Sequence, residues 1–221
     1  HERSGDLKKA DEQYATALAE RADYPFALAA VGRVAGKMKN YAKAEAFLKQ
    51  AIVRMPDAHF HADLARVYKL QGKETEASEE IRITEETLIG LSGKEHGTTH
   101  SDHGHSHEVG LEMARFELEF HKDLPNALAN AEHEFEHREN NIEVNSAMAA
   151  IHYASGNLSE AQVHLDMAKK TGCKNAELLL IEGLIKTANG NMKAGKKLVK
   201  EAFARDPYLQ HPLVAEGHKV V

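Results

Sequence analysis

The stretches GNLSEAQVHLDMAKKTGCK, residues 156–174, and GNMKAGKKLVKEAFARDPY, residues 190–208, share one pattern. Each opens with Gly-Asn, which favours a turn, and continues with a hydrophobic residue and a helical segment with small residues at fixed positions. The same order of residue types occurs at 5–23 and 39–57. Four copies of one pattern predict an internal repeat.

The period of this repeat is set by a recurrent small residue near the start of each helical segment. It falls at Ala10, Ala44, Ala77, Ala127, Ala161 and Gly195. Successive members are separated by 34, 33, 50, 34 and 34 residues, and 50 is one period of 34 residues plus 16 more. Half a period earlier lies a second set of helical segments, with small residues at Gly32, Ala65, Ala149 and Gly183. The unit is therefore a helix A, a tight turn and a helix B.

This unit predicts an all-α fold of about 12 antiparallel helices without a sheet. The helix A segments are expected near 25–38, 58–71, 108–121, 142–155 and 176–189, with a last one from 209. The 16 extra residues correspond to an insertion at 92–107. We therefore divide the chain into N-terminal repeats at 1–91, an insertion loop at 92–107 and C-terminal repeats at 108–221.

The repeat resembles that of the tetratricopeptide repeat (TPR) family, whose unit is a 34-residue helix–turn–helix. The family's closing proline corresponds to Pro56 and Pro207, while Leu28 and Leu179 stand in place of its early Trp. Thr84 and Glu134 replace the second small residue of helix B on either side of the insertion, which suggests looser packing there. The resemblance implies a right-handed superhelical solenoid that binds an extended peptide or a partner helix on its helix A side chains.

The residues that the resemblance places in this groove are mixed in character. They include Phe26, Arg33, Lys37, Tyr153, Leu180 and Leu184. The Lys, Asn and Arg set with which chaperone-binding members hold a C-terminal carboxylate is missing. A groove for packing against a protein or peptide partner is favoured over a chaperone-tail adaptor.

The insertion contains the tract EHGTTHSDHGHSHE, residues 95–108. Neutral imidazole is a good ligand for Zn, Ni and Cu, and a carboxylate can complete the set. The candidate metal ligands are His96, His100, His103, His105, His107 and Asp102. The alternative is a solvated linker in which histidine only tunes solubility and charge.

A second histidine pattern, HEFEH at 133–137, matches the H-E-x-x-H signature of zinc proteases, with Glu134 as the general base. It lies within a helix B, at a position that normally packs a small residue. Neither a third ligand nor an active-site strand accompanies it. We therefore expect no enzyme, and no catalytic or cofactor-binding residue is assigned. His133 and His137 could instead add ligands to the tract if it folds back onto this helix.

Bulk composition narrows the class of partner. The net charge of −6 and the lack of a visible basic stripe argue against nucleic-acid binding. No apolar run reaches the roughly 18 residues that cross a membrane. The chain starts with His1, as a processed, excised or incomplete chain would, and no signal peptide is visible. The compartment is left open, with an exported or periplasmic location slightly favoured over a cytoplasmic one.

The two ends of the chain each hold half a repeat: residues 6–21 form a helix B without its helix A, and 209–221 form a helix A without its helix B. The two halves are complementary, so copies could assemble head to tail into a ring or filament. Our leading hypothesis is a non-enzymatic interaction scaffold that binds a protein or peptide and could form homo-oligomers. The second is a metal-binding or metal-buffering protein that uses the histidine tract.

Overall fold

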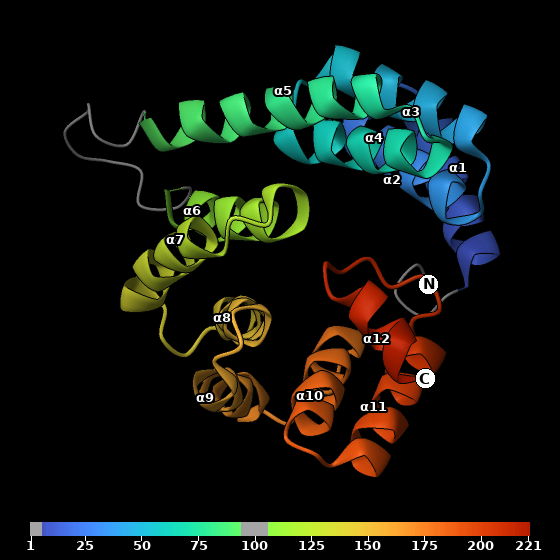
Figure 1. Cartoon of the computed structure of the whole chain (residues 1–221). Coiled ribbons are helices and arrows are strands. Elements are labelled where there is room, and N and C mark those ends of the chain that lie inside the picture. The colour runs from blue at the N-terminus through green and yellow to red at the C-terminus, as the bar shows by residue number, and fades with distance from the viewer. Residues whose placement is uncertain (1–5, 94–105) are drawn as a thin grey trace. The chain divides into compact units, whose positions relative to one another are not determined.

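The computed structural model describes residues 6–93 and 106–221, and in these residues every regular element is helical. The chain divides into two compact units, His1–Lys94 and Glu95–Val221. The described parts hold twelve α-helices, as the repeat predicts, and each unit is built from antiparallel pairs (Figure 1). The predicted fold class, an all-α solenoid of paired helices, is confirmed.

Unit 1 consists of a lone helix B followed by two helix pairs. Its helices are α1 (Leu7–Glu20), α2 (Pro25–Lys37), α3 (Tyr41–Arg54), α4 (Ala58–Gln71) and α5 (Glu74–Gly93). α2 pairs with α3 and α4 with α5, while α1 packs on α2.

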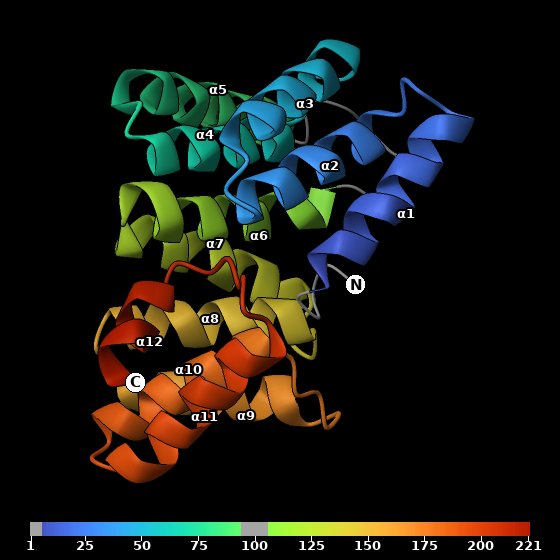
Figure 2. The same ribbon diagram turned by 90° about the vertical axis from the view of Figure 1, so that its right-hand side faces the viewer.

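Unit 2 consists of three helix pairs and a lone helix A. It contains α6 (Ser106–Phe116), the π-helix η3 (Glu117–His121), α7 (Leu124–His137), α8 (Ile142–Ala154), α9 (Leu158–Lys169), α10 (Ala176–Ala188), α11 (Met192–Arg205) and α12 (Val214–Val220). α12 packs on α10 and α11, which Figure 2 shows from the side.

The turn residues of the repeat work as helix caps. Asn191 precedes α11, and its side-chain oxygen accepts a hydrogen bond from the Ala194 N–H at 3.3 Å. Asn40 does the same for α3. Such caps satisfy backbone N–H groups that a helix start otherwise leaves without a partner. The Lys-Asn turn before α3 and the Gly-Asn turn before α11 therefore fix where these two B helices begin, whereas Asn157 of the Gly-Asn turn before α9 forms no side-chain cap hydrogen bond.

The recurrent small residues form the contacts between helix A and helix B. Ala44, Ala127 and Ala161 are fully buried. The closest approach is between α10 and α11, where a Cβ added to Gly195 would lie 2.6 Å from the Gly183 carbonyl oxygen. Hydrophobic residues such as Leu165 and Ile181 fill the space around these contacts. The period in the sequence is thus a period of close helix contacts.

The third repeat departs from this register. Its helix A small residue is Ala114, which is fully buried but lies 13 residues before Ala127, whereas Ala149 and Gly183 lie 12 before their partners. The π-helix Glu117–His121 lies between the two alanines. A π turn accommodates one extra residue in a helix. One residue of the irregular 50-residue spacing is therefore held in η3, while α5 extends to Gly93.

The packing around Glu134 is tight, contrary to the looser packing suggested by its sequence position. Its side chain is 1% exposed and lies over Gly110, where an added Cβ would be 2.6 Å from the carboxylate Oε1. Oε2 accepts a hydrogen bond from Arg138 at 2.5 Å. The missing side chain of Gly110 leaves the room that the larger residue occupies. Thr84 is likewise buried, with its hydroxyl donating to the Glu80 carbonyl.

The predicted helix boundaries differ from the structure mainly at the last helix A. α4 spans the predicted 58–71, whereas α12 begins at Val214 and not at 209. Pro212 disfavours helical backbone in His211, and the Leu213 N–H bonds instead to His211 Nδ1 at 3.2 Å. The helix starts only after this turn.

Candidate partner-binding surfaces

The predicted groove residues are divided between the two units. Phe26, Arg33 and Lys37 lie on α2 of unit 1, whereas Tyr153 lies on α8 and Leu180 and Leu184 lie on α10 of unit 2. Each unit therefore presents its own helix A face.

On the helix A face of unit 1, Phe26 belongs to an aromatic cluster that crosses from α2 to α4. Its ring is 51% exposed and meets the ring of Phe60 on α4 edge to face, with centroids 5.7 Å apart. Tyr24, just before α2, also meets the Phe26 ring, with centroids 5.7 Å apart, and the Arg21 guanidinium lies over the Tyr24 ring. Exposed aromatic rings held by neighbouring rings are a common anchor for a protein partner.

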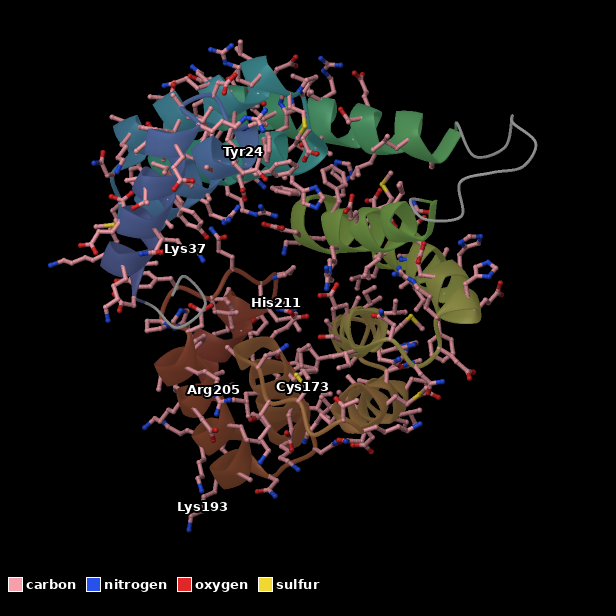
Figure 3. The ribbon with its side chains drawn as sticks, turned by 180° about the vertical axis from the view of Figure 1, so that it is seen from behind. Tyr24, Lys37, Cys173, Lys193, Arg205 and His211 are labelled. Atoms are coloured by element: carbon pink, nitrogen blue, oxygen red, sulfur yellow. The ribbon has the colours of Figure 1, made fainter. Side chains whose placement is uncertain are left out.

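Charged groups continue this face beyond the aromatic cluster. The Asp63 carboxylate of α4 accepts hydrogen bonds from Arg33 at 3.3 Å and from Arg66 at 2.7 Å. This Arg–Asp–Arg group connects α2 and α4 and fixes the two guanidinium groups. Lys37 lies on the last turn of α2, partly buried (Figure 3).

The helix A face of unit 2 is more polar than predicted. The Ser146 hydroxyl of α8 donates to Glu177 of α10 at 2.6 Å, and His211 Nε2 lies 4.0 Å from the same carboxylate oxygen. Burial lowers the pKa of His211, although the negative charge of Glu177 opposes the shift. Burial raises the pKa of Tyr153, which is partly covered. These groups connect α8, α10 and the segment before α12.

Leu180 and Leu184 do not line an open groove. Their exposed fractions are 0% and 1%, and they belong to the main hydrophobic cluster of unit 2. α12 packs on α10, and an added Cβ at Gly217 of α12 would lie 2.6 Å from a Leu180 methyl carbon. The prediction of these two residues as partner contacts is therefore wrong for this structure, because both are buried in the core of unit 2 and the last helix lies against Leu180.

The predicted metal ligands fall largely outside the described residues. Five of them lie in the part of the chain that the structure does not describe: His96, His100, Asp102, His103 and His105. For the sixth, His107, only its place in the first turn of α6 is described. His133 and His137 are exposed on α7, with ring centroids 5.3 Å apart. Glu134 between them is buried and bound to Arg138. The H-E-x-x-H pattern therefore has its carboxylate in the core and its imidazoles in solvent, which does not suit a zinc protease.

One surface was missed in the sequence. α11 carries an exposed group of lysines, Lys193, Lys196, Lys197 and Lys200, which we call the lysine face. The expectation that no basic stripe exists is therefore wrong for this helix. The signal was the spacing of these residues, at i, i+3, i+4 and i+7, which the negative net charge of the chain obscured.

No protein-family model matches the chain, and no curated protein sequence matches it. Among solved structures, its fold is similar to that of PilW, a type IV pilus biogenesis factor, with a TM-score of 0.54, 16% identity, and coverage of 96% of this chain and 91% of that chain. BtubC from P. vanneervenii matches with a TM-score of 0.50, 14% identity and coverage of 89% and 86%. A monomeric mutant of IFIT1 matches with a TM-score of 0.59 and 14% identity, and 89% of this chain covers 46% of that chain.

At these identities the similarity concerns the fold alone. The paired-helix repeat of the structure is the TPR-like architecture that the resemblance implied. None of the described helices is both long enough and apolar enough to span a membrane.

Proposed function

We propose that this chain is a non-enzymatic scaffold that binds a protein or peptide partner on the helix A face of unit 1. The observation that carries the proposal is the aromatic cluster of Tyr24, Phe26 and Phe60, in which Phe26 remains half exposed at a predicted groove position. A partner side chain that covers Phe26 would bury apolar surface without first ordering the ring. The Arg33–Asp63–Arg66 group beside it offers directional polar contacts.

The proposal is tested with a displayed library of peptides selected on the full chain. Selected peptides are then measured by fluorescence anisotropy against the wild type and two variants. Phe26→Ala should weaken binding by about tenfold or more, since aromatic anchors dominate interface energies. Val53→Ala is the matched control, because Val53 is 82% exposed on α3, a helix B. Equal binding by the Phe26 variant would contradict the proposed site.

A second candidate function is the binding of divalent metal by the histidine tract. Five imidazoles within residues 96–107 support it, since imidazole nitrogens are good ligands for Zn, Ni and Cu. The test is titration of untagged protein with Zn²⁺, Ni²⁺ and Cu²⁺ by calorimetry. A variant with His96, His100, His103, His105 and His107 changed to Ser and Asp102 to Asn should lose binding. Retention of full affinity would assign the metal to other residues.

Head-to-tail assembly through the two terminal half repeats is a finer hypothesis about the same scaffold. Its support is the repeat pattern: among the described helices, α1 is a helix B that packs on α2, and α12 is a helix A that packs on α10 and α11. In the structure, Leu213 and Gly217 of the last half repeat are buried within their own unit, so α12 already acts as a cap. Light scattering from dilute to high micromolar concentration tests it, and a change of Val214 to Lys on α12 should reduce any association through this end.

A further inference from the structure

Charge is strongly segregated along unit 2. Residues 106–168 contain 12 acidic residues and 3 Lys or Arg residues, whereas residues 169–221 contain 5 acidic residues and 10 Lys or Arg residues. The net charge of −6 therefore hides an acidic half and a basic half in one compact unit. Charge arranged in this way produces opposite potentials at two surfaces of the same molecule.

The basic half is centred on the lysine face of α11. Lys193, Lys196, Lys197 and Lys200 are exposed, and none forms an ion pair with another described residue. Figure 3 shows Lys193 directed away from the ribbon. Helical spacing places the four ammonium groups on one side of the helix. The single acid of α11, Glu201, is paired with Arg205 at 3.2 Å and leaves the lysine face cationic.

The acidic counterpart is on α7, which contains no Lys or Arg. Three exposed acids form what we call the glutamate face: Glu132 and Glu136 on α7, and Glu139, which lies just after this helix. Glu132 and Glu136 are four residues apart on α7, as Lys193 and Lys197 are on α11, while Glu139 follows the non-helical C-cap residue Arg138. The remaining acid of α7, Glu134, is buried and paired with Arg138.

The two faces belong to separate helix pairs of the same unit. α7 packs on α6 and α8, and α11 packs on α10 and α12. Figures 1 and 2 both show α8 and α10 between them. A contact between the lysine face and the glutamate face therefore requires two copies of the chain.

We propose that the lysine face of one copy binds the glutamate face of a second copy. Such a contact uses different surfaces on the two partners, so it is heterologous and leaves a free face of each kind for further copies. It involves helices B and so does not depend on the groove function proposed above. A second copy is favoured over nucleic acid or an anionic lipid surface, because the matching acidic spacing is present in the chain itself and the net charge of −6 repels polyanions.

The association should be weak and dependent on salt. Each exposed ion pair contributes little, and its attraction is screened over about 10 Å at about 0.1 M salt and about 3 Å at about 1 M. We therefore expect self-association at high protein concentration in low salt and its loss in high salt.

Sedimentation velocity over a concentration series of the full chain tests the proposal. Lys197→Glu/Lys200→Glu and Glu132→Lys/Glu136→Lys should each weaken self-association by about tenfold or more, since both create repulsion between copies. Mixing the two variants should restore association, because reversed charges then face each other. Lys8→Glu/Arg54→Glu, which changes two exposed residues of unit 1, is the matched control and should associate as the wild type does.

Circular dichroism of each variant establishes that the helices are retained. A wild type that stays monomeric in low salt at high concentration would overturn the proposal, as would association that neither variant changes or that mixing fails to restore. Binding of vesicles with anionic lipids, or of duplex DNA, by a monomeric wild type through the same lysines would assign the lysine face to a polyanion instead. The peptide-binding measurement on the Phe26 variant tests the proposed groove of unit 1. Its outcome does not depend on whether the copies associate through unit 2.

Discussion

In the α10–α11 pair, the two helices meet through Gly183 and Gly195, and their backbones nearly touch. In the α6–α7 pair, the corresponding small residues Ala114 and Ala127 are fully buried, and the buried Glu134 lies over Gly110. Both pairs belong to the same unit and the same repeat. The difference teaches that the space between the two helices of a pair must be filled by side chains of a matching total volume. Either helix can supply that volume, as long as the other helix leaves the room for it.

The largest effect is expected at the close contact. Gly195→Ala should lower the free energy of unfolding by about 2 kcal/mol, because the new Cβ would lie 2.1 Å from Thr187 Oγ1 and 2.6 Å from the Gly183 carbonyl oxygen. Urea unfolding followed by circular dichroism measures it. Gly90→Ala is the control, since nothing lies within 4 Å of its added Cβ on α5, and it should stabilise by up to about 1 kcal/mol. Equal effects of the two changes would show that helix propensity alone matters at Gly195.

The exchange of volume in the α6–α7 pair predicts coupling between two residues. Glu134→Ala should destabilise by about 2 kcal/mol, since it empties a buried site and removes the carboxylate that binds Arg138. Gly110→Ala should also destabilise, because its Cβ meets Glu134. In the double variant the added methyl group enters the vacated space, so the two effects should fall short of additivity by about 1 kcal/mol. Strict additivity in a double-mutant cycle would contradict this account.

A smaller effect should come from the polar link between the α7–α8 turn, α8 and α9. The Asn145 amide donates to the Glu139 and Asn141 carbonyls, so its oxygen accepts from His164 Nδ1–H at 3.0 Å. Burial and the neighbouring His152 ring lower the pKa of His164 in the folded chain. Below about pH 6.5 the unfolded chain therefore binds more protons than the folded chain does. The free energy of unfolding should consequently decrease as the pH is lowered.

The measurement is the urea midpoint at pH values between about 7.5 and 5. The wild type should lose stability toward acid more steeply than His164→Gln, which has no titrating ring at this place. Parallel pH profiles would show that other groups carry the dependence.

The register of the fold could be predicted because it rests on local signals. Turn residues such as Asn40 and Asn191 act on the next few backbone N–H groups, and small residues recur with a period that needs no knowledge of partners. The third repeat could not be predicted in the same way. A π turn has no residue signature, and the fit of Glu134 over Gly110 joins residues from two helices that only the folded chain places together.

The candidate site shows the same division between local and distant information. Phe26 could be predicted as an exposed groove residue from its place on helix A alone. Leu180 could not, because its burial depends on whether the last helix packs back on α10 or is left free, and the sequence of α10 is silent on that point. The spacing of the four lysines in the sequence indicates the lysine face, but the net charge of the whole chain does not, because acidic residues elsewhere outnumber the basic ones.

The packing of each helix mainly on its neighbours in sequence also bears on how the chain folds in time. A contact between two segments that are near each other in the sequence closes only a short loop. Little conformational entropy is therefore lost before the first stabilising contact forms, and chains with mainly such contacts fold fast. We expect unit 2 to nucleate at the α10–α11 hairpin, where the backbones approach closely. Growth would then proceed pair by pair toward α6, so that the π turn and the seating of Glu134 are completed last.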